Sequence, residues 1–378
     1  MPKPIKVMTI LGTRPEIIRL SETIKVLDQL FEHTLVHTGQ NYDYELNQVF
    51  FEDLGLRKPD HFLAAAGTTA IETVANVMKA VDEVLEDVQP EAFLVLGDTN
   101  SALGVYPAKR RHIPIFHMEA GNRCFDFRVP EEINRRIVDH ISDINMPYTE
   151  HARGYLLAEG FPPDRIIKTG SPMNEVINRH HAAIQESTAL SRLSLKPGQY
   201  MVASVHREEN VDRPERLAAL IQTLNAVVAH HGKPILFSVH PRTAKRLDEL
   251  GAKLDALVRT TKPLGFIDYI ALQEHAACVL SDSGTVTEEA SLLGFPAVTL
   301  RQAHERPEGM DEGTVVLCDL LPDRIVNAVE VAVAQKERFG SPRIVGDYKT
   351  EQVSWKVAKI IMGYTDYVRR EVWKEGYE

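Results

Sequence analysis

Short apolar runs along this chain alternate with longer segments in which apolar residues recur at helical spacing. The apolar runs predict strands at residues 5–11, 34–37, 92–96, 113–118, 143–146, 165–168, 200–205, 234–239, 277–280 and 297–300. The helical spacing predicts helices at 15–30, 214–230, 285–293 and 351–374. Strands that alternate with helices in this way are typical of βαβ units and therefore of parallel sheets.

Two turn signals divide this alternation into halves that look like two copies of one architecture. The first is Thr169-Gly170-Ser171-Pro172, and the second is Pro197-Gly198, after which the alternation begins again. We therefore predict an α/β chain with two Rossmann-like, doubly wound domains that face a central cleft. The expected bounds are 1–170 for the first domain, 171–195 for a linker helix, 196–350 for the second domain, and 351–378 for a C-terminal helix that packs back on the first domain.

Composition narrows the class of protein. A length of 378 residues suits two domains, and 44% hydrophobic with 25% charged residues is an ordinary globular composition. The formal net charge of -10 disfavours nucleic acid or an anionic membrane as the main partner, because both need a positive field. The three cysteines have neither disulfide nor zinc spacing, which favours a reducing compartment. We find no signal peptide and no apolar stretch of about 18 residues, so we expect a cytoplasmic protein without a membrane span.

Four predicted strands are followed by unusually polar residues, at 12–16, 97–100, 117–121 and 206–210. Because ligands bind outside the carboxyl ends of strands in doubly wound folds, these residues are the first candidates for a site. Each also has a structural interpretation. Asp98 is suited to cap the following helix, His117 and His206 to make hydrogen bonds in the core or at its rim, and Arg14 to hold a loop. Glu119 is harder to explain structurally, because a carboxylate that ends a buried strand needs a partner or a function.

Two further segments carry candidate chemistry. Glu131 and Glu132 follow Pro130 in the first turn of a predicted helix, where compensation of the helix dipole is the favoured interpretation for Glu132. Glu131 lies close in sequence to the Glu119 loop and is a candidate for the same cleft. Residues 281–289 follow a strand and open a helix with small residues, an arrangement that lets backbone N–H groups approach a phosphate.

A nucleotide site around that helix has further candidates. Glu289, six residues after Ser283, is placed to accept hydrogen bonds from two ribose hydroxyls. His240 ends another strand and is a candidate to add positive charge beside the phosphates. Phe266 and Tyr269 are candidates to flank a base, although aromatic residues on helices more often belong to the core. The chain has neither GxGxxG nor GxxxxGK[ST], so we expect no NAD site, no other cofactor and no metal.

Eight stretches, in order along nearly the whole chain, resemble the non-hydrolysing UDP-N-acetylglucosamine 2-epimerase family. They are Gly12-Thr13-Arg14-Pro15-Glu16, Thr38-Gly39-Gln40, Gly97-Asp98-Thr99, His117-Met118-Glu119-Ala120-Gly121, Pro130 to Arg135, His206-Arg207-Glu208, Ser281 to Ala290, and Glu305-Arg306-Pro307-Glu308 with Gly313-Thr314. The resemblance implies the two-domain, GT-B-like fold that many nucleotide-sugar glycosyltransferases share, and usually a homodimer.

The resemblance also implies roles for residues of this chain. Four residues match the family's catalytic positions: Asp98, Glu119, Glu131 and His206. The residues matched to substrate and UDP binding are Arg14, Arg19, Arg135, His240, Ser283, Gly284, Glu289 and Arg306, and Phe266 joins this set as the candidate to flank the base. The implied reaction inverts C2 of a UDP-N-acetylhexosamine by eliminating UDP to a 2-acetamidoglycal and adding it back, for envelope polysaccharide precursors such as those of capsule or O-antigen.

Two positions depart from the common pattern of the family. Arg19 stands where the best-known members carry lysine, and Asn41 stands where they carry histidine, in a region that belongs to the allosteric substrate site of some bacterial members. The stretches 41–45 and 121–126 resemble a branch that acts on 6-deoxy-L-sugars and forms UDP-N-acetyl-L-fucosamine from its C2 epimer. The alternatives to a non-hydrolysing epimerase are a glycosyltransferase of GT-B type that uses a UDP-sugar donor, a hydrolysing epimerase, and a non-catalytic nucleotide-sugar sensor.

Overall fold

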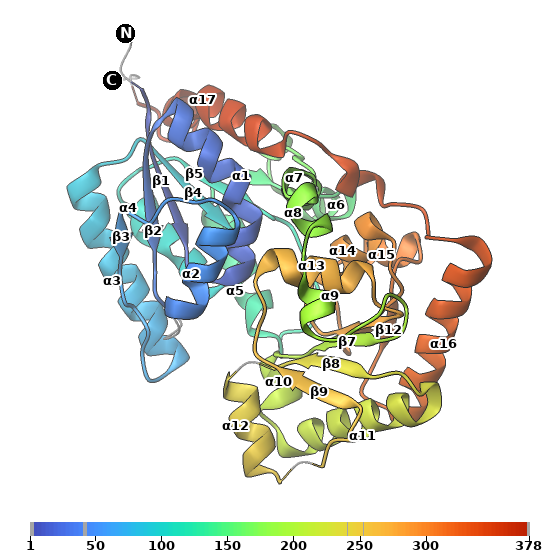
Figure 1. Cartoon of the computed structure of the whole chain (residues 1–378). Coiled ribbons are helices and arrows are strands. Elements are labelled where there is room, and N and C mark those ends of the chain that lie inside the picture. Colours follow the sequence, from blue (N-terminus) through green and yellow to red (C-terminus); the bar gives the residue numbers. More distant parts are fainter. Residues whose placement is uncertain (1–3, 41–43, 240, 252, 376–378) are drawn as a thin grey trace. The chain divides into compact units, whose positions relative to one another are not determined.

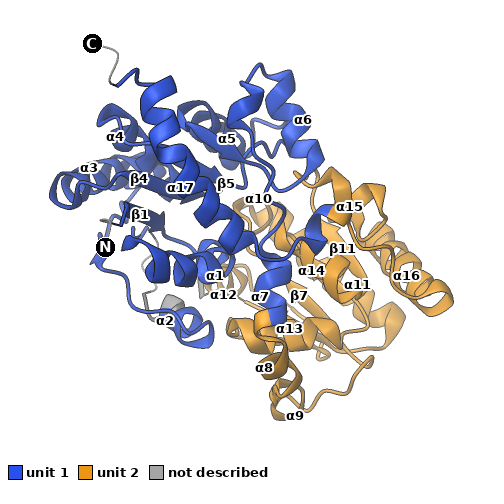
Figure 2. Cartoon of the chain, turned by 90° about the horizontal axis from the view of Figure 1, so that it is seen from above, with its two compact units in different colours: residues 1–178, 347–378 blue, residues 179–346 orange. Residues whose placement is uncertain are grey.

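The structure is a computed structural model that describes residues 4–40, 44–239, 241–251 and 253–375. Its contacts divide the chain into two compact units (Figure 2). Unit 1 comprises Met1–Asn178 and Asp347–Glu378, and unit 2 comprises Arg179–Gly346. This division does not test the domain bounds expected from the sequence, and those bounds remain predictions. Asn41 and His240, both singled out above, lie outside the described residues.

Unit 1 is built on one parallel sheet with the strand order β3-β2-β1-β4-β5-β6 (Figure 1). Its strands are β1 Lys6–Leu11, β2 Glu32–His37, β3 His61–Phe62, β4 Ala92–Leu96, β5 Ile115–Met118 and β6 Ile144–Met146. Its helices are α1 Arg14–Leu30, α2 Tyr44–Asp53, α3 Ala70–Val88, η1 Asn100–Gly104, α4 Val105–Arg110, α5 Pro130–Ile141, α6 Glu150–Ala158, η2 Pro163–Arg165, α7 Met173–Arg179, η3 Gly346–Lys349 and α17 Val353–Glu371.

Unit 2 repeats this topology. Read from its other edge, the sheet has the order β9-β8-β7-β10-β11-β12, which is the order of unit 1 with new numbers. Its strands are β7 Met201–Ser204, β8 Ile235–Ser238, β9 Val258–Thr261, β10 Val279–Ser281, β11 Ala297–Leu300 and β12 Val316–Cys318. Its helices are α8 His181–Gln185, α9 Ala189–Arg192, α10 Glu208–Val211, α11 Pro214–His231, α12 Pro241–Glu249, α13 Phe266–Glu274, α14 Thr285–Leu293, α15 Pro307–Asp311 and α16 Pro322–Phe339. The predicted class, two doubly wound Rossmann-like sheets, is confirmed.

The central strands form because their residues are apolar on both faces. Every residue of β4 is buried, as in a parallel sheet covered by helices on both sides. Helix α1 begins after β1 with Thr13 and Glu16 in a capping box and Pro15 in its first turn. The C-terminal helix α17 packs against α1 (Figure 1), so the end of the chain belongs to unit 1.

The sequence patterns predicted strands less well at the edges of the sheets than in their centres. The strand predicted at 165–168 is wrong, because Pro163–Arg165 forms a 3-10 turn and Ile166 makes only an isolated bridge with Asn145. The edge strands β3, β9 and β12 were not predicted, since none of them shows a buried apolar run. Within the described ranges, no helix is both long and apolar enough to span a bilayer.

Candidate active site

The loops after β1, β4 and β5 of unit 1 lie together at the carboxyl edge of its sheet. The strand order reverses between β1 and β4, and such a switch point is where doubly wound folds bind ligands. Glu16, which is 2% exposed, ties two of these loops together. Its carboxylate accepts hydrogen bonds from the backbone N–H groups of Gly12 and Thr13 and from the Thr99 hydroxyl. Burial raises the pKa of Glu16 to about 7, against the lowering effect of these hydrogen bonds.

Glu119 ends β5 in an unusual backbone conformation. Its φ is +65°, a left-handed value that side-chain-bearing residues rarely adopt. Its carboxylate forms an ion pair of 2.7 Å with Arg19 and accepts a hydrogen bond of 3.2 Å from Asn122. The same carboxylate lies over Gly97, where a Cβ would be 3.5 Å from Glu119 Oε2. Glu119 therefore has the partner that a buried carboxylate needs, and it lies beside the loop that carries Asp98.

Asp98 does not cap the following helix, so that interpretation is wrong. Thr99 is the cap of η1 and accepts a hydrogen bond from the Ser101 backbone N–H. The Asp98 carboxylate instead accepts hydrogen bonds of 2.9 and 2.6 Å from Arg135, and Asn134 donates to the Asp98 carbonyl. The Asp98 side chain remains 24% exposed while that of Arg135 is buried, so one oxygen is fixed and the group stays accessible.

The first turn of α5 differs from expectation. Glu132 is fully buried and pairs with Arg135 and Arg136, and it also accepts from the Cys124 backbone N–H. Glu132 therefore does more than compensate the helix dipole, because its buried carboxylate links the side chains of Arg135 and Arg136. Glu131 is half-buried in the same turn. Arg14, also half-buried, lies with its guanidinium 5.8 Å from the centre of the Phe50 ring.

In unit 2, Asp282 organises the loops after β7 and β10. It is fully buried and accepts hydrogen bonds from the backbone N–H groups of His206 and Arg207 and from the Asn210 side chain. The His206 side chain is 51% exposed, with Nδ1 3.4 Å from Asp282. Sequence reasoning did not single out Asp282, although its position between two small residues after a strand was a usable signal.

The start of α14 is held by a second group of charges. Arg306 donates to the Gly284 carbonyl and forms an ion pair of 2.7 Å with Glu288, and all but the glycine are buried. Ser283 Oγ lies 3.0 Å from Thr285 Oγ1. Glu289, in the next turn, accepts from Gln273. These contacts hold the start of the helix on both sides, which suits an anion site at a helix N-terminus.

Other candidates of unit 2 lie deeper. Phe266 is 3% exposed at the start of α13 and meets the His180 ring edge to face. Burial raises the pKa of the Tyr269 hydroxyl on the same helix. Arg301, which sequence reasoning missed, follows β11, is almost fully buried and pairs with Glu305 at 2.8 Å. The Glu305 carboxylate in turn packs against Gly284. A Cβ atom at that position would lie 2.6 Å from Glu305 Oε1, so a larger residue there would displace Glu305.

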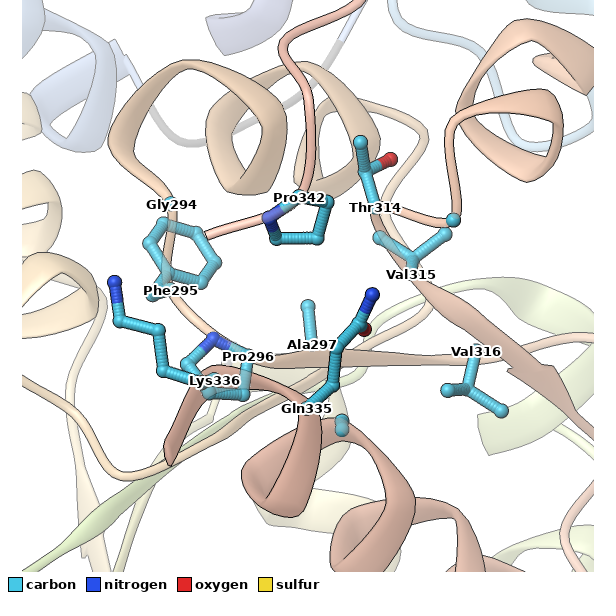
Figure 3. A pocket seen from close by; sticks show the side chains of 12 residues that line it. Gly294, Phe295, Pro296, Ala297, Thr314, Val315, Val316, Gln335, Lys336 and Pro342 are labelled. Atoms are coloured by element: carbon cyan, nitrogen blue, oxygen red, sulfur yellow. The ribbon is translucent and has the colours of Figure 1, made fainter. Parts of the chain in front are cut away.

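One pocket of unit 2 is too small to be a nucleotide site. Figure 3 shows it around Gly294, Phe295, Pro296 and Gln335. Its volume is about 10 Å³, close to the space of one water molecule. It also lies at Ala297, where β11 begins, and so at the opposite end of the strand from the carboxyl edge. Among the side chains that the structure describes, no group of three or more His, Cys, Asp and Glu residues is placed to hold a metal ion.

Two doubly wound units of one strand order, with charged groups following the strands of both, give this chain a GT-B-like α/β fold. The family model described as UDP-N-acetylglucosamine 2-epimerase matches residues 25–362. The chain belongs to the UDP-N-acetylglucosamine 2-epimerase family, whose members are isomerases. The resemblance found in the sequence motifs is thereby confirmed at the level of family, fold class and enzyme class.

Solved structures and a curated relative agree with this assignment. The UDP-N-acetylglucosamine 2-epimerase of Rickettsia bellii is 48% identical, with a TM-score of 0.89 over 98% of this chain and 100% of that one. The enzyme of Methanocaldococcus jannaschii in complex with UDP-GlcNAc and UDP is 31% identical, with a TM-score of 0.89 over 95% of this chain and 100% of that one. The UDP-2,3-diacetamido-2,3-dideoxy-D-glucuronate 2-epimerase of Pseudomonas aeruginosa is 34% identical over 94% of this chain and 100% of its own length.

Proposed function

We propose that this chain inverts C2 of a UDP-N-acetylhexosamine without releasing the sugar from the enzyme. One observation carries the proposal. Asp98 and Glu119, each paired with a buried arginine, follow neighbouring strands of one parallel sheet. The Glu119 carboxylate also lies over Gly97, next to Asp98. Two carboxylates held at the ends of neighbouring strands are the groups that a reaction with proton transfer on two faces of one carbon needs.

The chemistry of the substrate explains why elimination is the proposed route. The C2 proton of an N-acetyl sugar is not adjacent to a carbonyl, so its direct removal is difficult. If a base takes this proton while the C1–O bond to UDP breaks, a 2-acetamidoglycal and UDP form together. UDP then adds back to C1 while a proton returns to the opposite face of C2. Atoms and charge balance across the cycle, and no redox cofactor takes part.

The proposed roles follow from position and charge. Asp98 and Glu119 carry the protons at C2, and Glu131 assists them. Arg19 and Arg135 hold the two carboxylates in place through the ion pairs described above. A well-placed acid or base typically contributes a factor of about 10²–10⁴ to the rate.

Unit 2 supplies the proposed site for the leaving group. The small residues Ser283 and Gly284 precede α14, so its N-terminal N–H groups are open to a diphosphate, with Arg306 alongside and Glu289 available to the ribose. His206, half-exposed after β7, is a further candidate of unit 2, and Arg14 is a substrate-binding candidate of unit 1.

The sugar is proposed at two levels. The class is a UDP-2-acetamido sugar, as the names of the relatives support through UDP-GlcNAc and a diacetamido-glucuronate. Within it, the stretches 41–45 and 121–126 favour a 6-deoxy-L-sugar, so UDP-N-acetyl-L-fucosamine and its C2 epimer are tested beside UDP-GlcNAc and UDP-ManNAc. The pathway we propose is the supply of envelope polysaccharide precursors in the cytoplasm. The three cysteines of the described chain are free, which fits a reducing compartment.

Proton exchange at C2 tests the reaction. The full-length protein is incubated in D₂O with UDP-GlcNAc, and separately with a UDP-6-deoxy-L-sugar, without acceptor or metal, and followed by proton NMR. We expect deuterium at C2 with the nucleotide still attached. Asp98→Asn and Glu119→Gln should each lower this exchange at least about 100-fold while UDP binding persists. Asp82→Asn, at an exposed ion pair with Arg111, serves as the control for removing a carboxylate.

The same experiment separates the other classes. A glycosyltransferase leaves C2 unexchanged and requires an acceptor, a hydrolysing epimerase releases free sugar and UDP, and a sensor binds the nucleotide sugar without turnover. Absence of exchange with both substrates contradicts the proposed reaction.

A further inference from the structure

Glu119 is held in its left-handed conformation by residues that are not part of the proposed reaction. Gly121, two positions later, is also left-handed, with φ of +80°, and a Cβ there would be 2.4 Å from the Ala152 carbonyl oxygen. The turn that carries Glu119 is thus confined to one backbone path. A rare conformation of this kind persists only where the surroundings determine it.

Asp139 of α5 binds this turn on both sides of Glu119. Its Oδ1 lies 2.9 Å from Nδ1 of His117, two residues before Glu119. Both of its oxygens lie 3.2 Å from the backbone N–H of Gly121, two residues after Glu119, which donates to them. Asp139 and His117 are both fully buried. One carboxylate therefore fixes the start and the end of the turn.

His117 links this turn to the neighbouring loop, which carries Asp98. Its Nε2 lies 2.9 Å from the carbonyl oxygen of Gly97, the residue before Asp98. A carbonyl oxygen is an acceptor only, so Nε2 carries a proton. Nδ1 lies 2.9 Å from the Asp139 carboxylate. The His117 ring therefore lies between the Asp139 carboxylate and the Gly97 carbonyl, and it joins the loop of Glu119 to the loop of Asp98.

The charges around Asp139 favour its ionised form. Arg123 donates to its second oxygen at 2.7 Å, in addition to the donation from Gly121. Burial alone would raise the pKa of Asp139, but the hydrogen bonds and charges of His117 and Arg123 hold it below its usual value.

A chain of alternating charges returns from this pair to Asp98. In order, the ion pairs join Asp139, Arg123, Glu159, Arg136, Glu132, Arg135 and Asp98. These seven groups alternate four carboxylates with three guanidinium groups, and His117 contacts the first of them, Asp139. The chain closes on itself, because His117 bonds to Gly97 and Gly97 precedes Asp98.

We propose that His117 and Asp139 are positioning residues, and that their buried contact sets the relative places of Glu119 and Asp98 for the reaction at C2. The inference rests on the proposed function of these two carboxylates. Neither positioning residue needs to touch the substrate. Their effect is to remove the freedom of the two loops that carry the proton-transferring groups, because a displacement of about 1 Å is enough to slow such a step about 100-fold.

A matched control separates positioning from simple stability. Asp143 is also a fully buried aspartate of unit 1, pairs with Lys109 and accepts from the Ile115 backbone N–H at the start of β5. It therefore bonds to the opposite end of the strand that Asp139 serves. We expect Asp139→Asn to lower kcat for C2 exchange about 100-fold with KM changed less than about threefold. Asp143→Asn should lower the melting temperature but leave kcat unchanged.

Two substitutions of His117 divide its contacts. In His117→Gln, the new side-chain amide takes the place of Nε2 and keeps the bond to Gly97, while His117→Asn keeps the contact with Asp139. Both variants should lower kcat, because each removes one of the two contacts that His117 makes, with Asp139 or with Gly97. Combining His117→Gln with Asp139→Asn should be no worse than the more impaired single variant, because both remove the same contact. The proposal is overturned if the reductions in kcat of the two single variants multiply in the double variant. It is also overturned if kcat of Asp139→Asn is no lower than kcat of Asp143→Asn.

A spectroscopic measurement tests the pair without activity. In protein labelled with ¹⁵N-histidine, the resonances that vanish in His117→Gln identify His117. We expect Asp139→Asn to shift the ring-nitrogen resonances of His117, because it alters the group that faces Nδ1, whereas Asp143→Asn should leave them unchanged. Unchanged His117 resonances in Asp139→Asn overturn the inference, whereas a wild type and variant that differ in this way without C2 exchange contradict only the proposed function.

Discussion

At the scale of single residues, Glu16 is a buried carboxylate whose pKa is strongly raised by its surroundings. Its pKa of about 7 exceeds the ordinary value of 4.5 because burial disfavours the ion. A group with a raised folded-state pKa binds its proton more tightly when folded. It therefore stabilises the fold fully below the unfolded pKa, and this contribution is lost as pH rises through about 7. The loss between pH 5 and 8 is up to about 3 kcal/mol.

Glu16→Gln removes this titration and tests it. The free energy of unfolding, measured with urea at pH 5, 6.5 and 8, should fall less with pH in this variant than in the wild type. Glu72 offers a control, since it makes similar bonds to Thr68 at the start of α3 but is exposed, and hydrogen bonds from Thr68 lower its pKa. Glu72→Gln should leave the slope from pH 5 to 8 as it is. Equal slopes for wild type and Glu16→Gln contradict the assigned pKa.

The sequence singled out candidate site residues but not the partners that the structure gives them. Asp98, Glu119 and Arg14 follow apolar runs at once, so the pattern itself points to them. Their bonds to Arg135, Arg19 and Asn122 join positions between 3 and 100 residues apart in the chain. A single sequence carries no signal for such pairs, which arise only when parallel strands bring their carboxyl ends together. Asp139 escaped notice for the same reason, since on a helix it looks like any surface acid.

At the scale of elements, α5 is unusual because its charges point inward. Glu132, Arg135 and Asp139 are buried, whereas Ile133 and Ile137, one turn apart, are 47% and 41% exposed. A helix of a monomer normally shows the reverse arrangement. We propose that this face of α5 packs against a second copy of the chain, in the homodimer that the family resemblance implies. The site charges then occupy the inner face of the helix, and the isoleucines the outer one.

Ile137→Asp tests the dimer without touching the described site charges. The wild type should sediment as a dimer at micromolar concentration, and the variant should dissociate, because a carboxylate in an apolar interface lacks a partner. Ile71→Asp is the control, because Ile71 is 78% exposed at the start of α3 and the substitution is of the same type. A wild type that sediments as a monomer, or a variant that remains dimeric, contradicts this interface.

Strands were predicted best where both faces are buried. The bounds of β4 and β11 match the predicted ranges, since all their residues are buried and apolar or nearly so. Edge strands such as β9, with the burial of Val258 followed by two exposed residues, have no such pattern. Helix α14 has the predicted bounds of 285–293, and Gly294, with φ of +71°, ends it at the C-terminal cap. Tertiary pairing, rather than local preference, decides the elements that were missed.

At the scale of the whole molecule, the proposal divides binding and chemistry between the units. UDP binding to the full-length chain should raise its melting temperature, and a ligand at about 100 times its Kd adds about 2.7 kcal/mol of stability. Asp98→Asn, in unit 1, should keep most of this shift although it lacks exchange activity. Arg306→Met, in unit 2, should lose much of it, because Arg306 holds the Gly284 carbonyl and Glu288 at the start of α14.

The comparison within each variant, with and without UDP, removes the effect of the substitution on the unliganded fold. This matters for Arg306→Met, which leaves the buried Glu288 without its arginine and so lowers stability by itself. Arg216→Met, at a half-exposed ion pair with Asp319 of the same unit, controls for loss of an arginine away from α14. If Asp98→Asn loses the UDP shift while Arg306→Met retains it, the nucleotide binds chiefly to unit 1, and the division of roles between the two sheets is wrong.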